Sequence, residues 1–452
     1  MYQHSLRIAR ADGICYDGFS RGIEFALHSF FIREVFIREN LKGACIIGQS
    51  GGPTAVINAS AQGVIQTALA SPQITRVLGA AHGIKGVLAD QLYDMGQEDP
   101  GQLELLQFTP SSALGSCRYK LADPDVDDTD YKRILEIFQK YDVRYFFYNG
   151  GNDSMDTCNK ISKYMQRVGY PCNIIGVPKT IDNDLSGTDH CPGYASAAKY
   201  IATSCMELYQ DARVYDTGTV VIVEIMGRHA GWLAGAAGLA TWAGSGPDLI
   251  YLPEVDFSME AFLADVKRVY EDTGNCLVAV SEGIHYGDGT FVSEAKTSAT
   301  DGFGHAQLGG LAALLAESVK RALGVKVRGI ELSLLQRCGS HLASLTDVRE
   351  AYLAGKAAVE AATAGLTDQM VALDCTRDAS GYRCQTKLIP LTQAANTERK
   401  VPLDWITPEG NGIRQPFIDY ALPLIQGELQ RPLAHGLPQF AHLKKVRTTD
   451  MD

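Results

Sequence analysis

The sequence predicts an α/β fold with parallel sheets, organised as two domains or as one intertwined pair. Short apolar runs alternate along the chain with glycine-rich polar loops and with stretches of helical composition. This is the order of strand, loop and helix in a parallel sheet. The length of 452 residues is too great for one simple core. A hydrophobic content of 46% and a charged content of 21% are ordinary for a globular enzyme.

Five apolar runs are predicted to be strands, and each ends in a loop rich in glycine or polar residues. They cover residues 43–48, 143–148, 173–177, 220–225 and 277–280. Helices are predicted over 54–69 and 155–168, directly after the first two of these loops. Residues 1–41 are an N-terminal extension of unknown role. Charged residues interrupt their apolar stretch, which excludes a signal peptide and a membrane span.

Charge and cysteine content exclude several classes of function. A net charge of −11 argues against nucleic acid or an anionic membrane as a partner. No apolar run is long enough for a transmembrane helix. The eleven cysteines are dispersed and include no CxxC pair, so reduced, mostly buried thiols and a cytoplasmic protein are expected. His190 and His341 have no visible partners in the sequence, which favours core or surface roles over metal ligation.

Two glycine-rich loops follow strands and open predicted helices. The first is Ser50 to Pro53, and the second is Gly150 to Ser154. Glycine lets the backbone approach a ligand, and a helix N-terminus attracts anions. The first loop lacks the lysine of a Walker A loop, and a tight turn without a ligand would have the same sequence. Two such loops on neighbouring strands favour a shared anion site.

Residues 178–184 are the segment of the sequence that is most informative about function. Lys179, Thr180, Asp182 and Asp184 follow a predicted buried strand, and ligands of open α/β sheets bind at the carboxyl ends of strands. In an extended loop the two carboxylates would point the same way. A cation, a candidate base and a candidate metal ligand together suit phosphoryl transfer. A solvated turn with a salt bridge is the alternative.

Further charged residues lie at or near later strand ends. Arg228 and Glu282 follow the fourth and fifth strands, while Arg328 and Arg337 flank a mainly apolar segment. A guanidinium suits bidentate phosphate binding, and a carboxylate at a strand end can hydrogen-bond sugar hydroxyls. Pairing with neighbouring residues, or a surface position, is the alternative for each.

Taken together, these motifs resemble the phosphofructokinase family over nearly all of residues 42–430. The resemblance rests on seven motifs in one order: Gly51-Gly52-Pro53, Gly115 to Arg118, Gly150 to Ser154, Pro178 to Asp184, Met226-Gly227-Arg228, Ser281-Glu282-Gly283 and Leu335-Gln336-Arg337. It implies two intertwined Rossmann-like domains with the active site in the cleft. It also implies a fructose 6-phosphate acceptor, Mg²⁺ and a homo-oligomer, a dimer or tetramer.

The resemblance also implies a division of the chain between the two substrates. Residues 42–190 with about 336–400 would form the phosphoryl-donor domain, and 191–335 with about 401–452 the sugar-phosphate domain. The residues expected to bind the donor are Gly51, Arg118 and Ser154. The residues expected to bind the substrate are Thr180, Ile181, Asp182, Met226, Gly227, Arg228, Glu282, Arg328, Leu334 and Arg337. Arg328 would reach a neighbouring subunit's site, as interface arginines of the family do.

Two positions are similar to the diphosphate-dependent branch of the family. ATP-using members carry Gly-Gly-Asp-Gly and Pro-Gly-Thr-Ile-Asp, whereas this chain has Asn152-Asp153 and Lys179 at the differing positions. Asp153 would place a negative charge where the α-phosphate of a nucleotide lies, and thus exclude ATP. Lys179 would supply a compact positive charge for the leaving phosphate. Asp182 would accept the proton of the sugar hydroxyl.

The chain departs from the family pattern at the metal and sugar positions. Asn152 stands where the family often has a magnesium-binding aspartate, and a neutral amide is a poorer ligand for Mg²⁺. Asp184 is therefore the second candidate ligand. Leu334 stands where the family has a histidine.

The predicted activity is reversible transfer of a phosphoryl group from diphosphate to O1 of fructose 6-phosphate, in glycolysis. ATP as donor, sedoheptulose 7-phosphate as acceptor, or a catalytically silent regulatory subunit are the alternatives.

Overall fold

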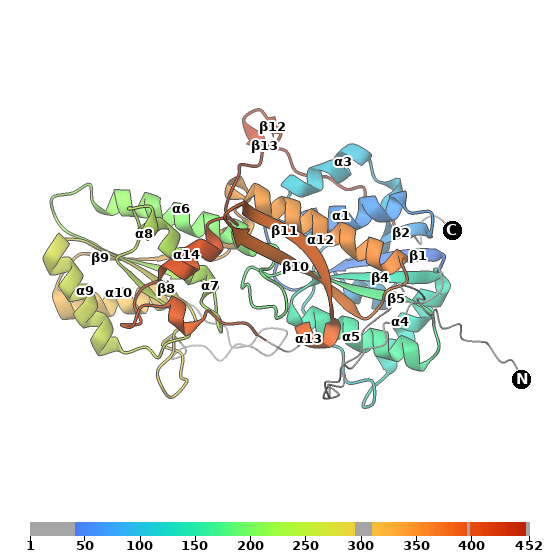
Figure 1. The fold of residues 1–452 in the computed structure, drawn as a ribbon, viewed down its shortest axis with the longest axis horizontal. Helices are drawn as coiled ribbons and strands as arrows, with labels where there is room; N and C mark the ends of the chain where they lie inside the picture. The colour runs from blue at the N-terminus through green and yellow to red at the C-terminus, as the bar shows by residue number, and fades with distance from the viewer. Residues whose placement is uncertain (1–40, 294–309, 396–397, 449–452) are drawn as a thin grey trace, which may run out of the picture. The chain divides into compact units, whose positions relative to one another are not determined.

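The computed structural model describes residues 41–293, 310–395 and 398–448. Two sheets organise these residues (Figure 1). One has seven strands in the order β11-β10-β5-β4-β1-β2-β3, and the other has four in the order β7-β8-β6-β9. Most strand pairs are parallel, and the antiparallel pairs of the large sheet, β2–β3 and β10–β11, lie at its two edges. The predicted α/β class is thus confirmed. The N-terminal extension lies outside the described residues, apart from Leu41.

The strands of the large sheet come from both ends of the described chain. They are β1 (Gly43–Gln49), β2 (Ile74–Ala80), β3 (Leu92–Asp94), β4 (Val143–Gly150), β5 (Asn173–Pro178), β10 (Gln369–Asp378) and β11 (Gly381–Pro390). The small sheet contains β6 (Val220–Ile225), β7 (Leu249–Tyr251), β8 (Cys276–Ser281) and β9 (Val327–Glu331). A separate short pair joins β12 (Leu433–Ala434) to β13 (Leu437–Pro438).

Helices cover both faces of the large sheet. One face carries α1 (Ile57–Ala70) and α12 (Leu345–Thr363), and the other carries α2 (Ile84–Leu88), α4 (Thr129–Lys140), α5 (Asn152–Arg167) and α13 (Leu391–Ala394). Alternate residues of β1 supply the two cores: Cys45 and Ile47 face α1, while Ala44 and Ile46 face the opposite layer. A strand buried on both faces is therefore apolar throughout, which is why its sequence is a continuous hydrophobic run.

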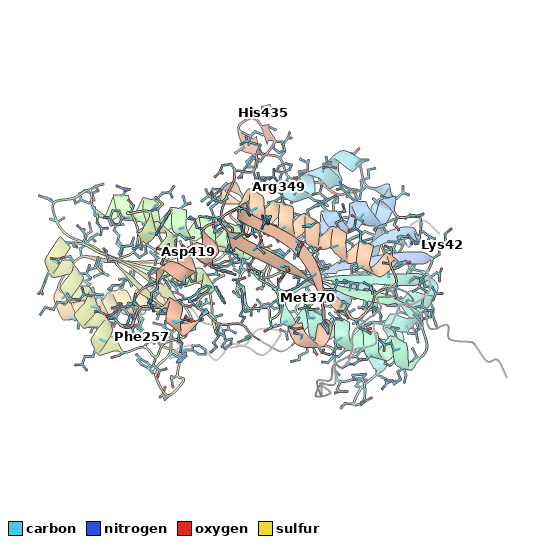
Figure 2. The ribbon with its side chains drawn as sticks, viewed as in Figure 1. Lys42, Phe257, Arg349, Met370, Asp419 and His435 are labelled. Carbon is cyan, nitrogen blue, oxygen red and sulfur yellow. The ribbon has the colours of Figure 1, made fainter. Side chains whose placement is uncertain are left out.

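The small sheet is covered in the same way. One face packs against α6 (Tyr194–Ala212), α7 (Trp232–Ala236), α8 (Gly238–Trp242) and α14 (Gln415–Ala421), and the other against α9 (Met259–Thr273) and α10 (Leu311–Leu323). Figure 2 shows Met370 of the large sheet and Phe257 beside the small sheet, and the side chains of both are buried. No helix within the described ranges is long and apolar enough to cross a membrane.

Short elements complete the chain. They are α3 (Pro100–Glu104), α11 (Leu335–Cys338) and the 3-10 turns η1 (Met95–Gln97), η2 (Leu105–Phe108), η4 (Ser340–Leu342) and η5 (Leu403–Trp405). The C-terminal segment returns to the large sheet, where Asp94 N donates to Val446 O at 2.9 Å. The assignment of residues 401–452 to the sugar-phosphate domain stays a prediction. Of these residues, helix α14 packs on the small sheet.

The predicted and observed elements differ in the boundaries of two helices and in the number of strands. The helix predicted from residue 155 begins at Asn152, which puts Asn152 and Asp153 in the first turn of α5. The helix predicted over 54–69 is α1, Ile57–Ala70. Strands β2, β3, β7, β9, β10 and β11 were not predicted. In β11 polar and apolar residues alternate in an exposed and half-buried pattern, so this edge strand lacks the apolar run used to find the others.

Candidate active site

A cavity of about 620 Å³ lies beyond the carboxyl ends of strands from both sheets. Loops after β1, β4 and β5 line it from the large sheet, and loops after β6 and β8 line it from the small sheet. The position agrees with the general location of ligand sites in open α/β sheets. Its lining residues are Gly51, Gly52, Pro53, Arg118, Gly151, Asn152, Asp153, Ser154, Lys179, Thr180, Ile181, Asp182, Asp184, Met226, Arg228, His229, Ala230, Glu282, Arg337 and Glu398.

The loop after β1 depends on a glycine and on a contact with residues far along the chain. Gly51 has a φ of 75°, and a β-carbon there would lie 3.3 Å from Lys179 Nζ. Its N–H donates to Cys117 O at 3.0 Å, and Ser116 Oγ donates to Gly51 O at 2.6 Å. These two bonds hold the segment before Arg118 against the glycine loop. They thereby bring the Arg118 guanidinium to the cavity wall.

The loop after β4 presents the N-terminus of α5 to the cavity. Asn152 and Asp153 occupy the first turn, and Asn152 Oδ1 accepts the N–H of Asp153 at 2.8 Å. Ser154 is buried one position later. Free N–H groups at a helix N-terminus attract anions, whereas the Asp153 carboxylate repels them. The loop therefore combines an anion-binding backbone with a negatively charged side chain at the same end.

Lys179 is the central cation of the cavity. Its side chain is buried, with the residue only 4% exposed, and Nζ donates to Gly52 O at 2.8 Å. Burial lowers the Lys179 pKa to about 8, although the Asp182 and Asp184 carboxylates oppose the shift. A buried ammonium with one hydrogen bond to the described part of the chain is suited to an anionic ligand, because a bound anion would supply further acceptors.

Asp182 and Asp184 lie beside Lys179 and face the cavity together. Burial raises the pKa of both carboxyls, and for Asp184, to about 7, repulsion by Asp182 and Glu398 adds to the effect. The loop between them is not extended as predicted, because Asn183 has a φ of 57°. Asn183 turns away instead, and its side chain donates to Tyr420 Oη at 2.8 Å. That bond fixes the turn from which both carboxylates project.

The small sheet contributes a second group of charges. Arg228 and Glu282 follow β6 and β8, and Glu282 accepts the N–H of Gly227 at 3.3 Å. Burial raises the Glu282 pKa to about 7. Burial, and next the nearby positive charge of Arg118, lower the Arg337 pKa. Two guanidinium groups so close to each other are stabilised by an anion between them.

Most predicted site residues line this cavity, and three do not. Gly227 is not a lining residue, but it binds Glu282 through its N–H. Arg328 is exposed on the edge strand β9, and Leu334 is 53% exposed before α11. Neither lines the cavity of the described chain. The predicted reach of Arg328 into a neighbouring subunit remains a prediction.

Sequence reasoning missed three lining residues, His229, Ala230 and Glu398. His229 and Ala230 directly follow the motif Met226-Gly227-Arg228, which already indicated that the loop after β6 belongs to the site. Glu398 lies in a segment without any motif, and an isolated bridge with Leu185 brings it to the cavity. No local pattern marks such a residue, because its position depends on the packing of distant parts of the chain.

His190 lies in the core, which is one of the two predicted roles, and it has partners that the sequence did not reveal. His190 is fully buried, and its Nδ1 and Nε2 lie 3.0 Å from Asp189 Oδ1 and 2.7 Å from Glu350 Oε2. Glu350 is 160 positions away in sequence, which is why no local pattern reveals the contact. His341 packs its ring edge against Tyr200, with 5.7 Å between centroids.

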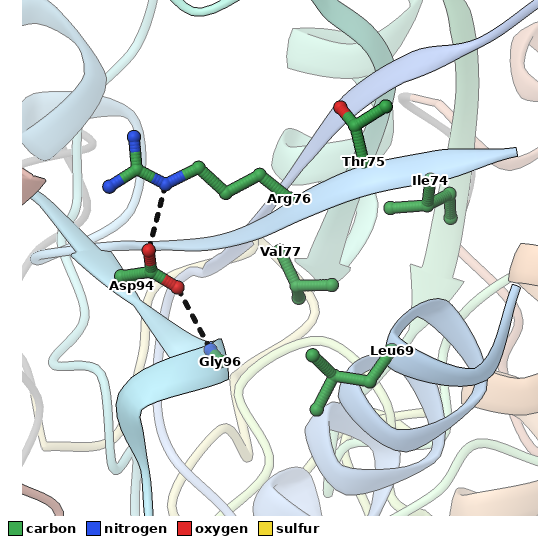
Figure 3. A pocket seen from close by; sticks show the side chains of 7 residues that line it. All are labelled: Leu69, Ile74, Thr75, Arg76, Val77, Asp94 and Gly96. Carbon is green, nitrogen blue, oxygen red and sulfur yellow. Dashed lines mark hydrogen bonds and ion pairs between the residues drawn. The ribbon is translucent and has the colours of Figure 1, made fainter. Parts of the chain in front are cut away.

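A second hollow, of about 380 Å³, lies beside β2 and α1 (Figure 3). Its cation, Arg76, is 2.8 Å from Asp94, whose other oxygen accepts the N–H of Gly96 at 2.9 Å. The charge of Arg76 is therefore already balanced within the hollow. The cavity around Lys179 contains many more charged side chains and lies at the carboxyl ends of strands, so it is the candidate active site.

Comparison with known proteins identifies the family of the chain. Residues 44–362 match the family described as phosphofructokinase. The chain is 48% identical to the pyrophosphate–fructose 6-phosphate 1-phosphotransferase of Xanthomonas campestris pv. campestris, over 89% of this chain and 97% of the relative. It is 46% identical to the protein of the same name from Halomonas elongata, over 88% and 96%.

Solved structures give the same result. A crystal structure of the pyrophosphate-dependent phosphofructokinase from Marinobacter aquaeolei superimposes with a TM-score of 0.81 at 44% identity, covering 90% of this chain and 97% of that one. The match extends over both sheets, because it covers most of the chain. On these grounds the chain belongs to the phosphofructokinase family.

Proposed function

We propose that this protein transfers a phosphoryl group from diphosphate to O1 of fructose 6-phosphate, giving fructose 1,6-bisphosphate and phosphate. The names of the two relatives described above support this activity. The observation that carries it in this chain is the placement of Lys179, Asp182 and Asp153 around one cavity. Lys179 and Asp182 are the groups phosphoryl transfer requires, and Asp153 disfavours a nucleotide donor.

In the proposed mechanism, the large sheet binds the donor and the small sheet binds the sugar phosphate. Gly51, Arg118 and Ser154 hold diphosphate together with Lys179. Arg228 and Arg337 hold the 6-phosphate. Thr180, Ile181, Met226 and Glu282 contact the sugar. Thr180 and Ile181 are the exceptions to this division by sheet, because they follow β5 of the large sheet and are assigned to the sugar.

Asp182 orients the O1 hydroxyl and accepts its proton as the new P–O bond forms. Thr180 Oγ1 accepts the Asp182 N–H at 3.1 Å, and this bond supports the turn from which the Asp182 carboxylate reaches the cavity. Lys179 neutralises the charge that develops on the departing phosphate. Burial strengthens this interaction, since the effective dielectric constant is lower than in water.

Magnesium fits the oxygen donors of the cavity. Burial, and next the neighbouring carboxylates of Asp182 and Glu398, raise the Asp184 pKa, and a divalent cation would oppose this shift. The Asn152 oxygen already accepts a backbone N–H, so Asp184 is the better of the two predicted ligands. A bound Mg²⁺ would supply charge neutralisation for the phosphoryl oxygens. Homo-oligomeric assembly and a cytoplasmic location stay predictions from the sequence.

A donor assay tests the proposal. Purified protein with fructose 6-phosphate and Mg²⁺ should form fructose 1,6-bisphosphate from diphosphate, and the reaction should run backwards with phosphate. Removal of the metal with a chelator should abolish turnover, and Mg²⁺ should restore it. Turnover with ATP but not with diphosphate would contradict the proposal. Absence of turnover with either donor would indicate a silent subunit, and sedoheptulose 7-phosphate in place of fructose 6-phosphate tests the acceptor.

A further inference from the structure

Two cysteines face each other on the hairpin that closes one edge of the large sheet. Cys375 on β10 is directly opposite Cys384 on β11 in the antiparallel register. Directly opposite residues have Cα atoms roughly 4.5–5.5 Å apart and side chains on the same face of the sheet. A disulfide requires a Cα separation of about 4.4–6.8 Å. The backbone register therefore permits a bond between the two sulfurs without movement of either strand.

These two thiols are accessible in a protein whose other thiols are mostly buried. Among the ten cysteines of the described residues, seven are buried, and only Cys338, Cys375 and Cys384 are half-buried. The buried thiols are apolar core residues; burial raises the pKa of Cys158 and of others like it above the usual value. An oxidant in solution therefore meets the hairpin pair before it meets most of the remaining thiols.

Cys375 also lies next to the buried imidazole ring of His190. Its Sγ is 3.8 Å from His190 Nδ1 and 3.3 Å from Tyr382 Oη. Burial opposes a charge on His190, yet its bonds with Asp189, Cys375 and Glu350 raise the His190 pKa well above its usual value. Hydrogen bonding from Cys384 and the neighbouring His190 lower the Cys375 pKa to about 6. The same contact raises the pKa of Cys384.

The two cysteines thus differ in the way that a nucleophilic and a resolving thiol differ. We propose that Cys375 and Cys384 form a reversible disulfide when the protein meets a peroxide. The Cys375 thiolate attacks one peroxide oxygen and the O–O bond breaks, which leaves a sulfenic acid on Cys375 and releases hydroxide. The Cys384 thiol then attacks the Cys375 sulfur, the S–O bond breaks, and water leaves. Both cysteines are oxidised by one electron each, and the peroxide accepts both electrons.

A metal site is the competing interpretation of the same cluster. Ligand atoms of Asp189, His190 and Cys375 lie within 4.8 Å of one another. However, both Asp189 oxygens accept hydrogen bonds from Arg377 at 2.8 Å, and both His190 nitrogens already have carboxylate partners. A metal would have to displace Arg377 from Asp189 and one of the two carboxylates from His190. The observations therefore favour the thiol pair.

Peptide mapping of the whole protein tests the proposal. The chelator-treated protein is exposed to hydrogen peroxide, and free thiols are then alkylated. We expect loss of alkylation at Cys375 and Cys384 together, a linked species lighter by the mass of two hydrogen atoms, and full recovery with dithiothreitol. Cys338, equally half-buried but unpaired with another thiol in the described residues, should still be alkylated.

Variants separate the roles of the two thiols. In Cys384→Ser the sulfenic acid has no resolving thiol, so dimedone should label Cys375, whereas the unsubstituted protein should give little adduct. Cys375→Ser should leave Cys384 alkylatable at the same exposure, and Cys338→Ser should behave like the unsubstituted protein. Circular dichroism verifies that each variant is folded. The proposal is overturned if both hairpin thiols survive oxidation, or if zinc ions alone protect Cys375 from alkylation and no disulfide forms.

Discussion

Asp153 and Lys179 are the residues on which the choice of phosphoryl donor is expected to depend. They come from neighbouring strand ends, β4 and β5, and both line the cavity. One is negative and lies in the first turn of α5, and the other is a buried cation. Diphosphate is small and highly charged, so it is attracted by the Lys179 ammonium. A nucleotide is longer, so its phosphates would also lie near the Asp153 carboxylate, which repels them.

Asp153→Gly tests the exclusion of ATP. Removing the carboxylate removes both its charge and its volume, so kcat/KM with ATP should rise by about tenfold or more, which corresponds to roughly 1.4 kcal/mol. Steady-state assays with both donors measure the effect. Asp156→Asn is the control, because Asp156 lies one turn further along α5 and pairs with Lys160 at 2.7 Å. No increase in ATP use would show that Asp153 does not exclude the nucleotide.

Lys179→Met tests whether the Lys179 ammonium stabilises the transition state. The pH dependence of activity gives a second, independent test. Loss of one buried charge that stabilises a transition state should reduce kcat with diphosphate about 10²–10³-fold. Because the Lys179 pKa is about 8, the ammonium is lost as the pH rises, and kcat/KM of the unsubstituted enzyme should fall above that pH. The residual activity of the variant should lack this alkaline decline. Lys163→Met, at an exposed position of α5, should leave both the rate and the profile unchanged.

At the scale of elements, the close contact between α1 and α12 supports one face of the large sheet. Gly63 and Gly355 allow it: a β-carbon at Gly63 would lie 2.2 Å from Tyr352 O, and one at Gly355 would lie 2.0 Å from Ser60 O. Both clashes involve backbone atoms, which cannot rotate away. The two helices thus pack at a distance that only glycine permits.

Gly355→Ala should therefore destabilise the protein. Although alanine is the better helix former by about 1 kcal/mol, the clash requires the helices to separate, and overpacking costs about 1–3 kcal/mol or more. Urea denaturation should show a lower free energy of unfolding. Lys356→Ala is the control, since Lys356 is an exposed neighbour on α12 with a 3.6 Å surface pair to Glu360. Unchanged or higher stability of Gly355→Ala would contradict the packing argument.

At the scale of the whole molecule, Arg399 connects the active-site loop to the helices beside the small sheet. Its backbone N–H donates to Asp184 O at 2.7 Å, and its guanidinium donates to Asn183 O at 3.2 Å. The same guanidinium lies 4.5 Å from the ring centroid of Trp232, whose Nε1 donates to Arg399 O at 2.9 Å. One residue thus joins the turn that carries Asp182 and Asp184 to α7.

Arg399→Gln should weaken both stability and substrate binding. The substitution leaves buried carbonyl oxygens without donors, at about 1–3 kcal/mol each, so the free energy of unfolding should fall by about 2–4 kcal/mol. The KM values for both substrates should rise, because the turn holding the carboxylates loosens. Urea denaturation and steady-state kinetics measure these changes. Arg414→Gln removes a comparable bond to a carbonyl, that of Asp404, and should leave KM unaltered.

The motif residues were predictable because they follow strands. Carboxyl ends of parallel strands meet at one edge of a sheet, so Lys179, Asp182, Arg228 and Glu282 converge once their strands are found. The start of α5 at Asn152 was less predictable, since polar residues suit both a loop and a first helical turn. The edge strand β11 was missed because its exposed and half-buried residues alternate and it has no continuous apolar run.

The α/β class, the family and most of the cavity-lining residues can be predicted from the sequence, because they depend on local apolar runs and on short motifs. Only the folded chain reveals the position of Glu398 near Asp184, the pairing of His190 with Glu350, the link through Arg399 and the exposure of Arg328. Each of these depends on contacts between residues far apart in the chain, and such contacts are set by the packing of whole elements and not by local sequence.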